Sequence, residues 1–204
     1  MRITGGELNG RILGAIKGWN IRPTSSKVRQ AVFNIIGNDI SGFRVIDFFA
    51  GSGIMGIEAL SRGAEWAMFV DNSDKSLSSI KKNLELCGFS KKGHLLKRDM
   101  SKGVPQHDKL KEGCIDFVFI DPPYGKDIIP GVLESIIESK IMAGDSYIVA
   151  ESMKHDSLPD KVGDFFLVKT RLYGETKLDI YNKVEPSCGT SLRETDRYKT
   201  KEIR

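Results

Sequence analysis

Residues 44–71 read RVIDFFAGSGIMGIEALSRGAEWAMFVD. The apolar run 44–49 predicts a buried strand, residues 54–63 have the apolar spacing of a helix that ends at a glycine, and 66–71 predict a second strand. A strand, a helix and a strand in about 30 residues form the unit that pairs two strands in parallel. This stretch therefore predicts a parallel sheet covered by helices.

The same alternation continues along the chain. We expect further strands at 94–99, 115–121 and 146–152, with helices at 73–88 and near 127–140. Only Gly174 and Glu175 separate the runs 165–173 and 176–184, which is too short for a helical crossover and predicts an antiparallel hairpin. The predicted class is α/β: a seven-stranded, mostly parallel sheet with helices on both faces and a C-terminal antiparallel hairpin.

The bulk composition is that of an ordinary globular protein. The chain has 204 residues, of which 40% are hydrophobic and 28% charged. No apolar run approaches the roughly 18 residues of a membrane-spanning helix, and the first residues do not resemble a signal peptide. The 3 cysteines and 3 histidines are dispersed, so we expect neither a disulfide nor a metal site. These features predict a cytoplasmic protein, which we expect to be a monomer.

Positive charge is concentrated near the start of the chain. Residues 1–30 carry a net charge of +5 within a chain total of +4, so the rest of the chain is almost neutral. A basic arm on a neutral body is a common feature of nucleic-acid-binding proteins, although a solvated basic surface would have the same composition. The candidate RNA-binding residues are the cations of this segment: Arg2, Arg11, Lys17, Arg22, Lys27 and Arg29.

A glycine motif lies at the junction between the first strand and its helix. Gly51, Gly53 and Gly56 have the spacing GxGxxG, and Asp71 lies twenty residues beyond Gly51 at the end of the second strand. This pattern is typical of a site for a nucleoside-containing cofactor, in which the acid accepts hydrogen bonds from ribose hydroxyls. The motif alone leaves open whether the cofactor is NAD or S-adenosylmethionine.

Asp47 favours S-adenosylmethionine. It lies four residues before Gly51, where it would repel the pyrophosphate of a dinucleotide bound at the following helix N-terminus. S-adenosylmethionine has no phosphate and carries two cationic groups, an ammonium and a sulfonium. We expect the backbone of Ala50, Gly51, Ser52 and Gly53 to pass closely around its methionine part.

Asp99 ends the third predicted strand and is a further candidate for the cofactor site. Its carboxylate could accept a hydrogen bond from the adenine amino group, or it could simply form a local turn. Both roles are compatible with the sequence.

A second motif, Asp121-Pro122-Pro123-Tyr124, follows the fourth predicted strand. The two prolines hold a short backbone segment stiff. Asp121 and the Pro122 carbonyl can each accept one hydrogen from the exocyclic amino group of a base, which turns the nitrogen lone pair towards a methyl donor, and Tyr124 can stack on that base. An ordinary aspartate has a pKa of about 3.9, so we expect Asp121 to act mainly by positioning and electrostatics rather than as a strong base.

The two motifs together resemble a known group of enzymes. DPPY after the fourth strand, with DFFAGSGIMGIEALSRGA, is similar to the amino-group methyltransferases of the class I S-adenosylmethionine-dependent fold. The segments RITGGELNGRIL and IRPTSSKVRQAVFNII resemble one branch, the RsmD-type guanine-N2 methyltransferases of bacterial small-subunit ribosomal RNA, and the likeness runs from about residue 2 to 184. The resemblance implies methylation of one guanine of 16S ribosomal RNA, G966, within an assembling or assembled small subunit.

Other functions share parts of this pattern. An adenine-N6 methyltransferase acting on DNA or another RNA could use the same DPPY motif, and a non-catalytic RNA-binding relative would keep the fold. An NAD-dependent enzyme would share the glycines but would need a substrate domain, for which the chain is short. Methylation of a protein glutamine is a fourth possibility, although Asp rather than Asn at position 121 disfavours it.

The resemblance also suggests three parts of the chain. Residues 1–40 would be a basic RNA-binding extension made of a short hairpin or arm and a helix. Residues 41–184 would be the S-adenosylmethionine-dependent methyltransferase domain. The polar tail at 185–204 has the composition of a disordered segment.

Overall fold

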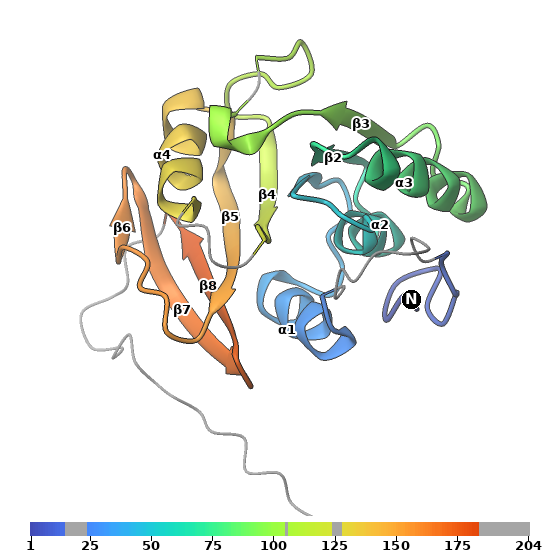
Figure 1. Ribbon diagram of the computed structural model, residues 1–204, viewed down its shortest axis with the longest axis horizontal. Coiled ribbons are helices and arrows are strands. Elements are labelled where there is room, and N and C mark those ends of the chain that lie inside the picture. The colour runs from blue at the N-terminus through green and yellow to red at the C-terminus, as the bar shows by residue number, and fades with distance from the viewer. Residues whose placement is uncertain (15–23, 105, 124–127, 184–204) are drawn as a thin grey trace, which may run out of the picture.

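A computed structural model describes residues 1–14, 24–104, 106–123 and 128–183 (Figure 1). Its helices are α1 (Ser26–Ile36), α2 (Ile54–Ser61), α3 (Asp74–Cys87), the short 3-10 helix η1 (Met100–Lys102) and α4 (Ile129–Ser139). Its strands are β1 (Arg44–Phe48), β2 (Trp66–Asp71), β3 (Gly93–Lys97), β4 (Ile115–Ile120), β5 (Met142–Met153), β6 (Lys161–Val162), β7 (Phe165–Tyr173) and β8 (Thr176–Asn182).

The strands form one sheet in the order β3-β2-β1-β4-β5-β8-β7-β6. Strands β1 to β5 pair in parallel, and β8, β7 and β6 continue the sheet in antiparallel pairs. Because β2 and β4 lie on opposite sides of β1, the chain reverses its direction of winding between β1 and β4. The carboxyl ends of the strands at such a switch point are where open α/β sheets bind ligands.

The predicted class, the parallel sheet and the terminal hairpin are confirmed, with two differences in detail. The described sheet has eight strands rather than seven, because Lys161 and Val162 pair with the start of β7. A two-residue strand is too short to show any alternation in the sequence. Strand β5 also begins at Met142 rather than at residue 146.

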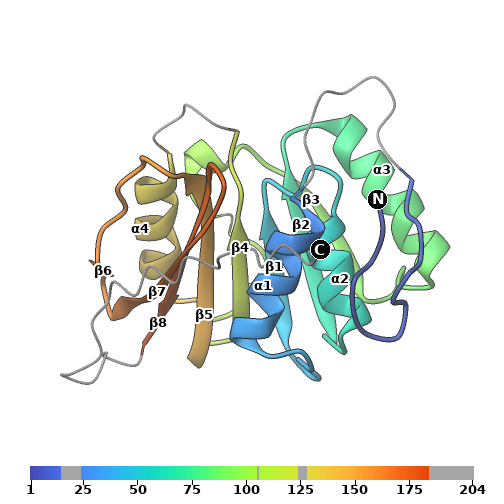
Figure 2. The ribbon, with the colours of Figure 1, turned by 90° about the horizontal axis from the view of Figure 1, so that it is seen from below.

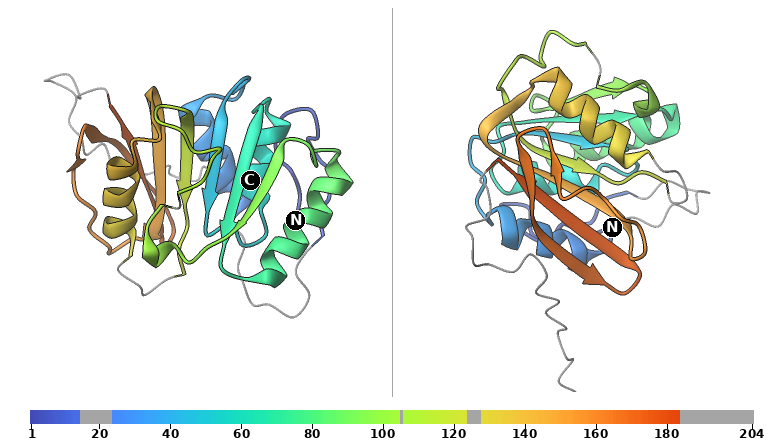
Figure 3. Two further views of the ribbon diagram at one scale, coloured as in Figure 1. Left: turned by 90° about the horizontal axis from the view of Figure 1, so that it is seen from above. Right: turned by 90° about the vertical axis from the view of Figure 1, so that its left-hand side faces the viewer.

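Two apolar layers cover the sheet, one on each face. Side chains of α1, α2 and α3 form one buried cluster with the inward residues of the sheet, and α4 with Met100 forms the other. Figure 3 (right) shows α1 and α4 on opposite sides of the sheet. In the first layer Phe33 of α1 packs edge-on against Phe117 of β4, with 6.2 Å between ring centroids, so α1 is anchored over the central strands.

Helix α3 lies between the limits predicted from the sequence, Ser73 and Gly88. The Ser73 side chain accepts a hydrogen bond from the backbone N–H of Ser76, and Gly88 ends the helix in the left-handed conformation at φ 75°. Ser25 caps α1 in the same way by accepting from the Val28 N–H. Local polar signals therefore determine where these helices begin and end.

Residues 1–14 form a small hairpin that packs against the helical face. An isolated antiparallel bridge joins Arg2 to Ile12, and Figure 2 shows the hairpin, in dark blue, beside α2 and α3. Ile3 is fully buried in the same apolar cluster as α1 to α3. The contact is so close that a Cβ on Gly6, at φ 75°, would lie 1.8 Å from the backbone oxygen of Ser61. The division into an extension and a catalytic domain remains a prediction, but these residues share the core of the sheet.

No helix in the described ranges is long and apolar enough to cross a membrane. The predicted tail at 185–204 lies outside the described residues.

Candidate active site

Three carboxylates converge at the carboxyl edge of the central strands. Asp47 lies in β1, Asp71 ends β2, and Asp121 directly follows β4. The charges of Asp121 and Asp71 both act to raise the pKa of Asp47, so Asp47 interacts electrostatically with each of them. Among the described residues, none of the three carboxylates forms an ion pair with a lysine or arginine. The edge is therefore rich in carboxyl groups, which suits a cationic ligand because a nearby cation favours their charged form.

Asp47 is buried, with 2% of its surface exposed. Its Oδ2 accepts a hydrogen bond of 3.0 Å from the N–H of Gly56 in the first turn of α2. The residue at the helix start is Gly53, which has no side chain to cap α2, so Asp47 caps the helix from the neighbouring strand. Burial raises the pKa of Asp47 well above its ordinary value, and the bond from Gly56 acts in the opposite direction.

The loop between β1 and α2 has an unusual backbone. Gly51 and Gly53 have φ values of 52° and 73°, and the preceding Phe49 has φ 60°. A phenylalanine in the left-handed region is disfavoured by about 1–3 kcal/mol, and such residues cluster at functional sites. Ala50 donates its N–H to the carbonyl of Val70 at 3.1 Å, which helps to hold this conformation. The loop of residues 49–53 is thus tightly bent, as the glycine spacing predicts.

The second and third glycines of the motif also serve packing. A Cβ on Gly56 would lie 2.4 Å from the Phe69 ring, and one on Gly53 would lie 2.8 Å from Ile80. These glycines let α2 approach β2 and α3 closely, whether or not a ligand is present.

Asp71 uses both carboxylate oxygens within the protein. Oδ2 accepts from the N–H of Gly51 and Oδ1 from the N–H of Ser73, each at 2.8 Å. Asp71 therefore ties the glycine loop to the start of α3. The lone pairs that remain on its oxygens are the ones available for the predicted ribose contact.

Asp99 is exposed and begins η1, where its Oδ1 accepts from the N–H of Ser101 at 3.0 Å. The local-turn role considered for this residue is therefore present in the structure. Its contact with an adenine remains a prediction.

Asp121 lies in a half-buried position beside the start of α1. Its Oδ2 accepts a hydrogen bond of 3.2 Å from the Thr24 hydroxyl. Burial raises the pKa of Asp121 from 3.8 to about 6, and the Thr24 bond opposes that rise. The next residue, Pro122, is buried and Pro123 is exposed, whereas Tyr124 lies outside the described residues. The Asp121 pKa of about 6 differs from the ordinary aspartate value of about 3.9 that the sequence-based prediction used.

The basic residues of the N-terminal segment fall into different environments. The side chains of Arg2, Arg11 and Lys27 are exposed, and the Lys27 ammonium lies 5.8 Å from the centre of the Tyr173 ring on β7. Lys17 and Arg22 are outside the described ranges. We therefore retain the three exposed cations as the described candidates for RNA contact.

The structure contradicts the prediction that Arg29 contacts RNA, because its side chain is buried and not available to phosphate. It is only 2% exposed, and its Nε forms a 2.8 Å ion pair with Glu58. Its two Nη atoms donate to the backbone carbonyls of Thr24 and Arg2, each at 2.6 Å. Arg29 faces the core because α1 turns this side towards α2.

Glu58, which is the centre of this buried group, is not among the residues predicted from the sequence. Glu58 is fully buried on α2 and accepts hydrogen bonds from Arg29, Arg62 and both the N–H and hydroxyl of Thr4. Its position as the single acid in the otherwise apolar helix IMGIEAL could have indicated a buried, paired carboxylate. A buried acid needs a cationic partner, and Arg29 is one of its two.

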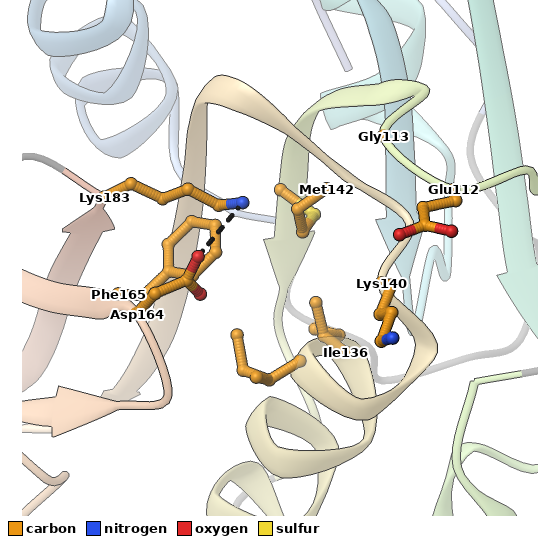
Figure 4. A pocket seen from close by; sticks show the side chains of 9 residues that line it. Glu112, Gly113, Ile136, Lys140, Met142, Asp164, Phe165 and Lys183 are labelled. Atoms are coloured by element: carbon orange, nitrogen blue, oxygen red, sulfur yellow. Dashed lines mark ion pairs between the residues drawn. The ribbon is translucent and has the colours of Figure 1, made fainter.

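A separate cavity of about 310 Å³ lies at the opposite edge of the sheet, where β4 and β5 begin and α4 ends (Figure 4). Asp164 and Lys183 form a 3.2 Å ion pair on its wall. The other residues that line it are Glu112, Gly113, Ile136, Ile137, Lys140, Met142 and Phe165. It is distinct from the carboxylate edge, and no residue of either motif lines it. No group of histidine, cysteine or acidic side chains in the described ranges could hold a metal ion.

Comparisons with known proteins agree with this architecture. The model of the family described as "Conserved hypothetical protein 95" matches residues 1–182. The chain is 38% identical over 183 residues to the Bacillus subtilis protein "Putative rRNA methyltransferase YlbH", with 90% of this chain and 99% of that protein covered. It is 27% identical over 187 residues to the Escherichia coli "Ribosomal RNA small subunit methyltransferase D", with 90% of each covered.

A solved structure described as "Putative methyltransferase yhhF from Escherichia coli" superimposes with a TM-score of 0.75 at 26% identity, covering 89% of this chain and 97% of that one. The family-model match at residues 1–182 spans both motifs and the N-terminal hairpin. The chain therefore belongs to the "Conserved hypothetical protein 95" family, which is the family of the RsmD-type methyltransferases predicted from its motifs.

Proposed function

We propose that the protein is an S-adenosylmethionine-dependent methyltransferase that modifies the exocyclic N2 of one guanine in 16S ribosomal RNA. The observation that carries this proposal is the placement of Asp121 and Pro122 at the carboxyl end of β4, beside the acidic end of β1. Family membership and relatives named as small-subunit ribosomal RNA methyltransferases support the substrate class. The identification of the target guanine as G966 is the most specific part of the proposal.

The residues at the carboxylate edge fit this cofactor. None of Asp47, Asp71 and Asp121 pairs with a described lysine or arginine. A ligand with an ammonium and a sulfonium would stabilise the charged forms of carboxyls whose pKa is raised, whereas a pyrophosphate would be repelled. Asp71 would hold the ribose, Asp99 the adenine, and the backbone of residues 50–53 the methionine part. When bound, the cofactor supplies an electrophilic methyl group on its sulfonium.

Asp121 and Pro122 would then position the acceptor amino group. The lone pair of this nitrogen is delocalised into the base, so the group is a poor nucleophile until its two hydrogens are held out of the ring plane. The Asp121 carboxylate and the Pro122 carbonyl would each accept one hydrogen, and a bond to a charged acceptor contributes roughly 1.5–3 kcal/mol. Tyr124 would stack on the base, an effect worth about 1–3 kcal/mol.

The raised pKa gives Asp121 a second role. With a pKa of about 6, Asp121 is ionised at neutral pH and can accept the amino hydrogen bond. It can also take up the amino proton once the nitrogen carries positive charge, and it binds that proton more tightly than an ordinary aspartate would. The proton would then pass to solvent.

The acceptor must be reachable before any of this chemistry can occur. Guanine N2 takes part in base pairing, so the enzyme needs an unpaired or extruded base. We propose that an RNA surface within a small subunit or its assembly intermediate presents that base to a monomeric enzyme in the cytoplasm. The exposed Arg2, Arg11 and Lys27 would contact phosphates around it.

Replacing Arg2, Arg11 and Lys27 together by glutamine should weaken RNA binding and make it less dependent on salt. Each contact with single-stranded phosphate contributes about −0.7 to the slope of log affinity against log salt, so the slope should flatten by about two units. The control replaces three exposed lysines elsewhere by glutamine: Lys91, Lys111 and Lys161. Equal slopes for the two triple variants in a salt titration would show that these N-terminal cations are solvated surface.

Asp47→Asn should separate the two roles of this residue, which are to cap α2 and to bind the cationic cofactor. The amide oxygen can still accept from the Gly56 N–H, so the free energy of unfolding should be kept or increased, because a buried charge is removed. Affinity for S-adenosylmethionine should fall by about tenfold or more, which corresponds to about 1.4 kcal/mol. Calorimetry measures both quantities, with the exposed Asp74→Asn as control. Unchanged affinity would mean that Asp47 serves only as a neutral helix cap.

Methyl transfer to small ribosomal subunits tests the whole proposal. Subunits from cells that lack the enzyme, and the RNA extracted from them, are incubated with protein and labelled S-adenosylmethionine, and the RNA is mapped by nuclease digestion and mass spectrometry. We expect one N2-methylguanosine at one position. A methylated adenine would instead support the adenine-N6 alternative, and no transfer to particle or RNA would refute the proposal.

A further inference from the structure

A chain of buried contacts runs from the core of α2 to the candidate catalytic carboxylate. Glu58 binds Arg29, and Arg29 Nη1 donates to the backbone carbonyl of Thr24 at 2.6 Å. The Thr24 hydroxyl then donates to Asp121 Oδ2 at 3.2 Å. Thr24 and Asp121 are 97 positions apart in sequence, so this contact exists only in the folded protein.

We infer that Thr24 is a positioning residue for Asp121: its hydroxyl occupies Oδ2 and thereby orients Oδ1 towards the amino group of the acceptor base. This inference rests on the proposed function. Thr24 is 8% exposed, and the bond from Arg29 holds its backbone, so the direction of its hydroxyl is set by the core. The Asp121 carboxylate would otherwise rotate about its side-chain bonds.

Within the described part of the chain, the Thr24 hydroxyl has no competing structural task at the start of α1. The cap of that helix is the neighbouring Ser25, whose side chain accepts from the Val28 N–H. The bond to Asp121 is therefore the contact that the hydroxyl makes, and a change at Thr24 leaves the helix cap intact.

The bond also affects the protonation of Asp121. Burial raises the pKa of this carboxyl and the Thr24 hydroxyl lowers it. Among the described residues, the charged group that interacts with Asp121 is Asp47 from β1, and this interaction is repulsive. The Arg29 guanidinium from α1 is directed to the Thr24 carbonyl. Loss of the hydroxyl therefore favours the protonated form, which cannot accept from the base with its proton-bearing oxygen.

Thr24→Val removes the hydroxyl and keeps the shape. In the cofactor-free protein, carbon-detected NMR of labelled aspartates should show the Asp121 pKa raised by about one unit, which corresponds to about 1.4 kcal/mol. In methyl transfer, the acid limb of the pH–rate profile should move up by about the same amount. At neutral pH kcat should fall about tenfold, because the loss of carboxylate orientation adds to a roughly twofold loss from protonation, while KM for the RNA changes less than about twofold.

Two further variants make the test specific. Thr24→Ser keeps the hydroxyl and should restore the wild-type pKa and pH profile. Thr170→Val removes a similar threonine–carboxylate bond, 2.6 Å to Asp179, on strands away from the site, and should change neither. An Asp121 pKa and an acid limb that are the same in Thr24→Val and in the wild type would overturn the inference. Wild-type protein that transfers no methyl group would refute the proposed function instead, and the NMR comparison would still decide whether Thr24 controls Asp121.

Discussion

Asp121→Ala should lower the rate of methyl transfer to the target guanine by roughly two to three orders of magnitude. The variant removes the acceptor that orients the amino group and the group that takes up its proton, whereas the proposed cofactor contacts lie on β1, β2 and the loop after β3. Binding of S-adenosylmethionine should therefore remain within about threefold of wild type. Single-turnover kinetics with saturating RNA measures the chemical step, and calorimetry measures cofactor binding.

Loss of folding should not explain the effect of this variant. A carboxyl with a raised pKa in the folded protein stabilises it most below its ordinary pKa of 3.8, and this contribution is lost as the pH rises through about 6. At neutral pH the ionised Asp121 is therefore a cost to stability, and its removal should leave the protein at least as stable. The exposed Asp108→Ala is the matched control. Near-normal transfer by Asp121→Ala would rule out the amino-group mechanism.

Glu58→Ala should destabilise the folded protein by about 3–5 kcal/mol. The change leaves Arg29 and Arg62 buried without their carboxylate, and these side chains are only 3% and 5% exposed. It also frees the Thr4 groups that bind Glu58 from the N-terminal hairpin. Urea unfolding followed by circular dichroism measures the loss.

Glu58→Gln should lie between the alanine variant and wild type, because the amide keeps an acceptor oxygen without the charge. Glu65→Ala is the matched control: Glu65 is exposed just beyond the same helix, and its replacement should change the free energy of unfolding by less than about 0.5 kcal/mol. If Glu58→Ala also stays within that range, the buried group contributes little to stability. Asp121 would then have to be positioned without support from the core of α2.

Much of the fold could be read from local patterns. The period of apolar residues predicted the main strands and helices, and Ser73 and Gly88 predicted the limits of α3, because caps act on neighbouring backbone groups. The two-residue turn at Gly174 and Glu175 predicted the hairpin of β7 and β8 for the same reason. Strand β6 has no such local signal, since its pairing depends on where β7 lies.

The motifs predicted which residues form the candidate site, but contacts between separate elements determine the hydrogen bonds and pKa values of these residues. Asp47, Asp71 and Asp121 could be placed at one edge from sequence, because parallel strands end on the same side of a sheet. That Asp47 caps α2 and that Asp71 binds the glycine loop depend on contacts between separate elements. The raised pKa of Asp121 likewise comes from burial, which no single segment determines.

The two cations of α1 show most clearly where sequence stops being informative. Lys27 and Arg29 are two residues apart in the same basic segment, and composition alone treats both as candidates for RNA contact. The sequence by itself determined that this segment is basic, helical and followed by a methyltransferase-like sheet. Only the tertiary structure decided that Lys27 faces outward beside Tyr173 while Arg29 is enclosed by Glu58 and the Thr24 carbonyl. The physical reason is that helix periodicity sets the angle between two side chains, whereas the long-range packing of α1 on α2 sets which of them is desolvated.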